Sequence, residues 1–157
     1  MDFGAFAEWL KYMATEYDLQ GICYDKWRID ELKRELGHHE ISANEEGLWI
    51  AGKFIPMVAH PQGYVNHGAE GLSMPISIDT VESKLHKRVL IVKANPALRS
   101  AALGAVAPPD QRLNRSFLKM KSKTRIDPMV AAAMAVGYAT SMDPPDWDDD
   151  AFKVHGV

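Results

Sequence analysis

One short apolar run that ends on an aspartate, Ile22-Cys23-Tyr24-Asp25, constrains the possible folds of this chain most strongly. A continuously apolar run of this length is typical of a strand that is covered on both faces. The segments before and after it carry apolar residues at spacings of three and four, which indicates helices with one buried face. The order helix, strand, helix predicts an α/β fold in which Asp25 stands where the strand leaves the sheet.

The two flanking helices are predicted over residues 3–17 and 29–37. The apolar stripe of the first is formed by Phe3, Phe6, Leu10, Met13 and Tyr17. The second has Ile29, Leu32 and Leu36 at helical spacing, and Gly37 is placed as its C-terminal cap.

The middle of the chain has a less regular pattern. Residues 38–53 show no clear period, and residues 54–59 read as a buried strand in which Pro56 argues against a central position. Residues 60–73 are predicted to form a loop, and Pro75 to open a helix that Ser73 caps. The apolar stripe of this helix is expected to consist of Ile78, Val81, Leu85 and Val89.

Toward the end of the chain, residues 101–107 and 113–121 flank a turn-forming Pro-Pro-Asp-Gln stretch. This pattern predicts a hairpin or a pair of extended arms. The last helix is expected to start at Asp127, with Asp127 as its cap and Pro128 in its first turn.

Composition narrows the class of protein. The chain has 157 residues, of which 46% are hydrophobic, enough for one domain with a buried core. The single cysteine, Cys23, cannot form an intrachain disulfide, which predicts a reducing, cytosol-like compartment. No apolar run approaches the length of about 20 residues that crosses a membrane, and no signal peptide is recognisable. We therefore expect no membrane association and no export.

The formal net charge of −3 hides an uneven distribution. Basic residues concentrate in one stretch, at Arg112, Arg115, Lys119, Lys121, Lys123 and Arg125, and acidic residues in the tail, at Asp143, Asp146, Asp148, Asp149 and Asp150. A local basic stretch can contact a polyanion even where the average charge is negative. The acidic tail, residues 142–157, is expected to be disordered.

Asp25 and Asp127 are the candidate metal ligands. Cleavage of a phosphodiester in the two-metal mode needs several carboxylates around Mg²⁺ or Mn²⁺. Functional residues of open α/β sheets collect beyond the strand ends, where Asp25 falls, and a helix N-terminus favours negative charge, as at Asp127. Helix capping alone is the commoner explanation for an aspartate in either place.

Basic residues alternate before Asp127, at Lys119, Lys121, Lys123 and Arg125. In an extended segment this spacing would place all four on one face, where they could meet DNA phosphates. A solvated strand face explains the same pattern without DNA. Histidines offer little as another site, because neither the adjacent His38-His39 nor His60 and His67 have a zinc-binding pattern. Surface or loop positions explain them better.

Several short motifs follow one another in a fixed order. They are Tyr24-Asp25-Lys26-Trp27-Arg28, Glu31-Leu32-Lys33-Arg34-Glu35-Leu36, Gln62-Gly63-Tyr64, Asn95-Pro96, Lys119, Lys121 and Arg125-Ile126-Asp127. Together they resemble the C-terminal part of the nuclease domain of bacteriophage terminase large subunits. The resemblance implies a partial nuclease domain over residues 3–141, with an RNase H-like α/β fold. Its mixed sheet would be flanked by helices and would lack the first strands of the fold.

The same resemblance implies a metal-dependent endonuclease that cleaves concatemeric viral DNA during genome packaging. Asp25 and Asp127 would be catalytic carboxylates that bind Mg²⁺ or Mn²⁺, and the lysines at 119 and 121 would contact DNA phosphate or metal-bound oxygens. The implied partners are double-stranded DNA, the portal and the small terminase subunit, in the cytoplasm of the bacterial host.

Departures from the family pattern leave the function open. The family's first catalytic aspartate lies on a strand upstream of anything in this chain, and Asp2 and Asp18 read as helix-end residues instead. A Gly-x-x-x-x-Gly-Lys-Ser/Thr phosphate loop is also missing, so the ATPase is not expected here. An upstream polypeptide could supply both parts. The alternative function is a catalytically inactive nuclease remnant that binds DNA or the portal, while a recombinase-like enzyme fits the aspartates but not the other motifs.

Overall fold

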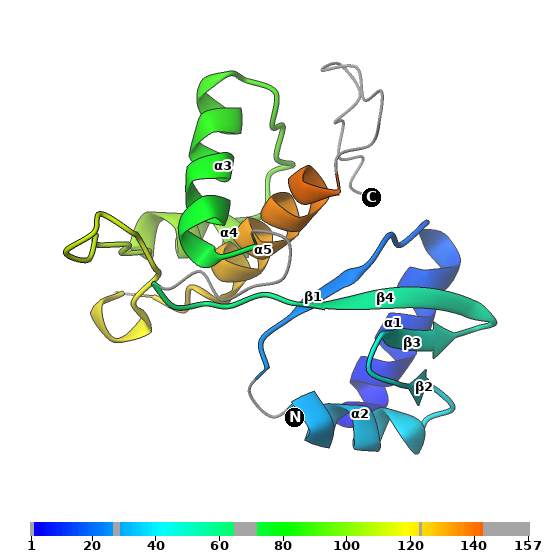
Figure 1. Ribbon diagram of the computed structural model, residues 1–157. Coiled ribbons are helices and arrows are strands. Elements are labelled where there is room, and N and C mark those ends of the chain that lie inside the picture. The colour runs from blue at the N-terminus through cyan, green and yellow to red at the C-terminus, as the bar shows by residue number, and fades with distance from the viewer. Residues whose placement is uncertain (1, 27–28, 65–71, 123, 143–157) are drawn as a thin grey trace. The chain divides into compact units, whose positions relative to one another are not determined.

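The computed structural model describes residues 2–26, 29–64, 72–122 and 124–142 of the chain. These residues belong to two compact units, Met1–Ala59 and His60–Val157 (Figure 1). The expected tail, residues 142–157, lies outside the described residues except for Met142. No helix among the described residues is both long enough and apolar enough to cross a membrane.

The first unit is a four-stranded mixed sheet with two helices. Its elements are α1 (Phe3–Glu16), β1 (Ile22–Tyr24), α2 (Ile29–Gly37), β2 (Ser42–Ala43), β3 (Gly47–Ile50) and β4 (Lys53–Ala59). The strand order is β1-β4-β3-β2, with β1 parallel to β4 and the other pairs antiparallel. The helices predicted over 3–17 and 29–37 and the strand over 22–24 are confirmed.

The core of this unit lies between the helices and one face of the sheet. Alternate residues of β3 and β4 point into it, and they pack with residues of α1 and α2. The buried members are Ala7, Leu10, Ala14, Leu36, Ile41, Leu48, Ile50, Ile55 and Met57. On the other face of the sheet the rings of Trp49 and Phe54 are in contact in a tilted arrangement, with centroids 5.4 Å apart, and both side chains are exposed.

Pro56 does not keep β4 at an edge, so that prediction was wrong. β4 pairs with β3 on one side and with β1 on the other. The amide of Met57 donates to the carbonyl of Glu46 on the β3 side, so the missing N–H of Pro56 falls on the opposite side. Pairing with β1 starts only at Met57, opposite Ile22. β4 pairs with β3 over residues 53–56 and with β1 over residues 57–59, so Pro56 lies just before the segment that pairs with β1.

The hairpin of β3 and β4 lies largely within the segment without a clear period. Ala51 and Gly52 form its two-residue turn with φ values of 50° and 78°, as in a type I′ turn. Gly47 is also required, because a Cβ atom there would overlap the carbonyl oxygen of Ile55. The predicted cap at Gly37 was wrong, since the left-handed residue after α2 is Glu40, with φ 62°.

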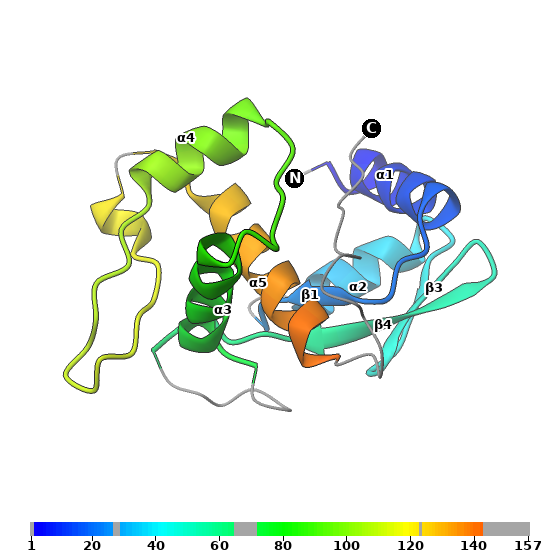
Figure 2. The same cartoon turned by 90° about the horizontal axis from the view of Figure 1, so that it is seen from above.

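The second unit is helical. It contains α3 (Met74–His86), α4 (Pro96–Gly104), the 3₁₀ turn η2 (Lys119–Lys121) and α5 (Asp127–Ser141), and α5 packs against both α3 and α4 (Figure 2). A Cβ atom on Gly137 of α5 would overlap Ser77 of α3, so the two helices approach closely there. The side chain of Asn95 caps α4 by accepting from the amide of Leu98 at 3.0 Å.

Two predictions for α3 were only partly correct. Ser73 occupies the N-cap position, but its hydroxyl makes no capping bond and is buried without a partner among the described residues. Ile78 and Val81 are buried as expected, whereas Leu85 is 49% exposed and the helix ends before Val89.

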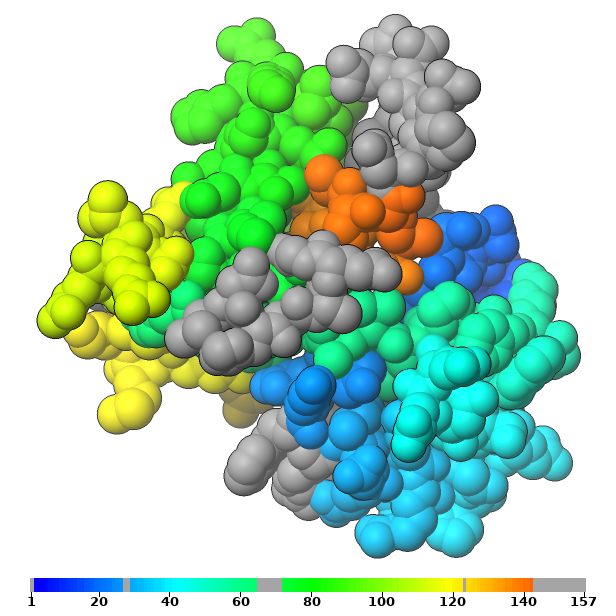
Figure 3. Space-filling model, viewed as in Figure 1, coloured from blue at the N-terminus to red at the C-terminus, as the bar shows by residue number. Residues whose placement is uncertain are grey.

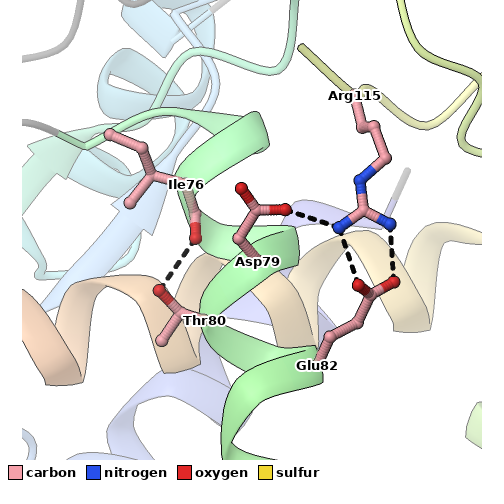
Figure 4. A network of polar contacts seen from close by, with 5 residues as sticks. All are labelled: Ile76, Asp79, Thr80, Glu82 and Arg115. Atoms are coloured by element: carbon pink, nitrogen blue, oxygen red, sulfur yellow. Dashed lines mark hydrogen bonds and ion pairs between the residues drawn. The ribbon is translucent and has the colours of Figure 1, made fainter. Parts of the chain in front are cut away.

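The predicted hairpin is confirmed only in part. Residues 101–104 belong to α4, so they are not an extended arm. The following segment does fold back, with an antiparallel bridge between Pro109 and Arg115 and a bond from the amide of Leu118 to the carbonyl of Val106. We call residues 106–118 the hairpin. The guanidinium of Arg115 holds it to α3 through Asp79 and Glu82 (Figure 4).

Candidate functional site

Asp127 is the first residue of α5 rather than its N-cap. Ile126 occupies the N-cap position, and its carbonyl accepts from the amides of Met129 and Val130 at 2.9 and 3.0 Å. Ile126 is only 1% exposed, so burial of this side chain fixes the start of the helix. The predicted start at Asp127 is confirmed, and its predicted capping role is wrong. The carboxylate is therefore available for contacts outside the helix.

Lys119 is the direct partner of Asp127. Its Nζ lies 2.6 Å from Asp127 Oδ1, and the two side chains are 62% and 64% exposed. The hydrogen bond from Lys119 lowers the pKa of Asp127, burial opposes it, and the charges of Lys119 and Arg125 add to the lowering. Asp127 is consequently an accessible carboxylate that stays ionised at neutral pH, which is the state in which it can bind a cation.

The basic residues before Asp127 do not form the extended face that their spacing predicts. Lys119 and Lys121 lie in η2, and three residues per turn point their side chains in different directions. Lys121 and Arg125 are exposed. Lys123 lies outside the described residues. The structure thus pairs Lys119 with Asp127 and places the charge of Arg125 where it also lowers the pKa of Asp127. Lys121 is exposed in the same turn as Lys119.

Asp25 is an exposed residue directly after β1 in the first unit. This places it at the carboxyl end of a strand that runs parallel to β4, as the sequence predicts. Beside it, Tyr24 lies under the Nζ of Lys33 at 5.9 Å, and the same Nζ donates to the carbonyl of Asn44. These contacts fix the end of β1 from which Asp25 projects.

The residues that the structure describes contain no group of three or more His, Cys, Asp or Glu side chains placed to hold a metal ion. Asp25 and Asp127 each offer one exposed carboxylate, a ligand type that suits Mg²⁺ and Mn²⁺. Each can therefore contribute one ligand, and neither forms a complete site from its described neighbours.

The buried His60 and the partly buried Cys23 lie apart from this chemistry. His60 follows β4 outside any helix or strand, which is the expected loop position, but its side chain is only 1% exposed and therefore does not lie at the surface. Its Nε2 lies 2.8 Å from the hydroxyl of Ser77. Burial raises the pKa of Cys23 to about 11, which keeps its thiol protonated and unreactive at neutral pH. Sequence spacing gave no signal for the His60 contact, because its partner on α3 lies 17 residues further along the chain.

Two comparisons with known proteins relate this chain to a bacteriophage protein. The chain is 30% identical over 141 residues to the terminase large subunit of Enterobacteria phage HK97, a match that covers 88% of this chain and 24% of the relative. The chain is a relative of phage terminase large subunits. Its structure also matches the crystal structure of the HK97 bacteriophage large terminase, with a TM-score of 0.69 and 27% identity over 88% of this chain and 25% of that one. No family model matches the chain.

The terminase match confirms the predicted fold class. The mixed four-stranded sheet with helices is an RNase H-like α/β fold, as the order of the short motifs implied. The chain spans about a quarter of the length of the HK97 terminase subunit. The similarity over this quarter shows a shared fold and ancestry, and it does not by itself show the activity of the whole terminase.

Proposed function

We propose that this chain is the C-terminal portion of the nuclease of a phage terminase large subunit, which cleaves concatemeric viral DNA during genome packaging. The observation that carries the proposal is the ionised, exposed carboxylate of Asp127 paired with Lys119 in a relative of the HK97 terminase. An acidic group surrounded by cations suits a site that must bind both a divalent metal and a phosphodiester.

Each candidate residue has a proposed role. Asp25 and Asp127 each supply one carboxylate ligand for Mg²⁺ or Mn²⁺, and Lys119 orients Asp127. Lys121 and Arg125 contact DNA phosphates, a role that Lys123 shares. A bound metal would orient the attacking water and offset the charge on the leaving oxygen. Further carboxylate ligands, including one from an upstream polypeptide that also carries the ATPase, complete the metal site.

The proposed setting follows from the same relationship. Double-stranded DNA is the substrate, and the portal and the small terminase subunit are the protein partners in the cytoplasm of the host. These partners are part of the proposal and rest on the terminase relationship alone.

A DNA- or portal-binding module without nuclease activity is the second candidate. The exposed Lys121 and Arg125 favour it, because side chains of this type bind phosphates whether or not a metal is present. The two candidates therefore differ in cleavage rather than in binding.

Cleavage of supercoiled plasmid in Mn²⁺ distinguishes them. The purified chain is incubated with plasmid alone, and then together with a polypeptide that carries the upstream aspartate strand. We expect nicked and linear DNA in the second mixture. Asp25→Asn and Asp127→Asn should each abolish it, whereas Glu45→Gln, which changes an exposed carboxylate on a loop of the first unit, should not.

Each result has a definite meaning. Cleavage in neither mixture, with retained DNA binding, would favour the binding module. Cleavage that survives the Asp25→Asn, Asp127→Asn double variant would overturn the assignment of the carboxylates while leaving a nuclease in place.

A further inference from the structure

Met120 is an apolar side chain that projects fully into solvent. Its exposed fraction is 102%, and it lies in η2 between Lys119 and Lys121. Figure 3 shows the yellow segment that contains η2 at the surface of the second unit. Burial stabilises a methionine side chain by roughly 1.5–3 kcal/mol, so complete exposure leaves that stabilisation unused.

The turn that carries Met120 is held by hydrogen bonds. The amide of Lys121 donates to the carbonyl of Leu118 at 3.2 Å, and the hydroxyl of Ser122 donates to the same carbonyl at 2.8 Å. The amide of Leu118 in turn donates to the carbonyl of Val106 at 2.9 Å. Met120 therefore stands on a backbone that is anchored to the hairpin, so little ordering is required when its side chain meets a partner.

The charges around Met120 identify the kind of partner. Lys121 follows it directly, Arg125 is exposed nearby in sequence, and Lys119 is bound to Asp127. An apolar groove on a protein would not require this concentration of cations, whereas DNA offers phosphates beside an apolar stack of bases. Minor-groove proteins combine cations with an inserted Met, Leu, Ile or Phe side chain in this way.

We infer that Met120 inserts at a base step of double-stranded DNA while Lys121 and Arg125 bind phosphates beside it. The inference rests on the proposed function for the identity of the ligand. Insertion partly unstacks the step and bends the duplex, at a cost of a few kcal/mol that the added contacts offset. Met120 and Lys119 lie in the same turn, η2, and Lys119 is paired with Asp127. The distorted base step would therefore be held by the turn that is joined to this candidate carboxylate.

DNA binding without cleavage tests this inference. The full chain is titrated in EDTA with a short duplex that carries 2-aminopurine at successive steps, and anisotropy and 2-aminopurine fluorescence are recorded over a range of salt concentrations. Three variants are compared with the parent: Met120→Ala, Lys121→Met and Leu103→Ala. Leu103 is the matched control, because it is 81% exposed on α4 and alanine suits a helix.

The variants should separate apolar insertion from charge. Met120→Ala should bind DNA about tenfold more weakly, as expected for losing one base contact, with the salt dependence unchanged. It should also lose the fluorescence rise that marks an unstacked base. Lys121→Met should reduce the slope of log K against log salt by about 0.9, and Leu103→Ala should change nothing.

Two results would overturn the inference. One is a Met120→Ala variant that binds like the parent. The other is parent binding without any fluorescence rise. A Met120→Ala variant that instead dissociates a dimer in sedimentation would assign the side chain to contact with a second copy. None of these readouts depends on cleavage, so the nuclease proposal and this inference can fail separately.

Discussion

Lys119 Nζ lies 2.6 Å from Oδ1 of Asp127, which joins the turn η2 to the first residue of α5. The hydrogen bond from the lysine lowers the pKa of Asp127 and so favours its ionised form. Seven residues separate the two in sequence, and the buried Ile126 fixes the start of α5 between them. Under the proposed function, a metal ion would take the place of the lysine at this carboxylate.

Removing the lysine should raise the pKa of Asp127. In Lys119→Met we expect this pKa to move up toward its ordinary value of 3.8, because the hydrogen bond from Lys119 is the largest cause of the lowering. Since the folded pKa lies below the unfolded one, the pair stabilises the fold above the unfolded pKa, and this is lost as pH falls through the folded pKa. Carboxyl carbon chemical shifts in an NMR titration measure the effect. Lys121→Met is the control and should leave Asp127 unchanged.

Arg115 should stabilise the hairpin against α3. Its guanidinium donates to both oxygens of Glu82 at 2.7 Å and also reaches Asp79, and this hydrogen bonding is the main reason that the pKa of Glu82 is lowered. We expect Arg115→Ala to lower the free energy of unfolding by about 1 kcal/mol, as for a well-formed pair near the surface. Urea denaturation measures this. Arg112→Ala, at the exposed tip, should have no effect, and an equal loss in both variants would contradict the role of the ion pairs.

Helices and single strands could be predicted where one residue pattern dominates. Apolar spacing located α1 and α2, because each packs one apolar face against the core. The apolar run at residues 22–24 located β1, whose three residues are partly buried. β3 was missed although Leu48 and Ile50 are buried around the exposed Trp49, an alternation too short to stand out from its polar surroundings.

Basic residues show why the site was harder to predict than the fold. Lys119 and Lys121 alternate in sequence as in a strand, yet hydrogen bonds to Leu118 wind them into a 3₁₀ turn. Lys119 was therefore predicted as one of the basic residues of the site, but its ion pair with Asp127 could not be predicted from the spacing. A contact of this kind depends on the local backbone path, which tertiary packing decides.

Close approach of α3 and α5 makes Gly137 sensitive to substitution. A methyl group there would overlap the hydroxyl and Cβ of Ser77, so Gly137→Ala should destabilise the chain by about 1–3 kcal/mol through overpacking. Gly37→Ala, at the end of α2 with no atom within 4 Å of the added Cβ, should be neutral or slightly stabilising. Thermal unfolding followed by circular dichroism compares the two. A neutral Gly137→Ala would show that the helices can separate without loss.

His60 should make the stability of the chain fall in mild acid. Burial lowers its pKa below the ordinary 6.5, and a hydrogen bond to the carbonyl of Pro61 only partly opposes this. The unfolded chain therefore takes up a proton first as pH falls below 6.5, and the stability present above that pH is lost until the folded pKa is reached.

Urea denaturation at about pH 7.5 and about pH 5 measures this loss. His60→Gln, whose amide can still reach the hydroxyl of Ser77, should be less stable at the higher pH but should lose less on acidification than the parent. The other described groups with lowered pKa values, Glu82 and Asp127, titrate at lower pH than histidine, so they contribute little to the difference. Equal acid sensitivity in the two proteins would show that His60 accepts its proton without cost, by turning the hydroxyl of Ser77 from donor to acceptor.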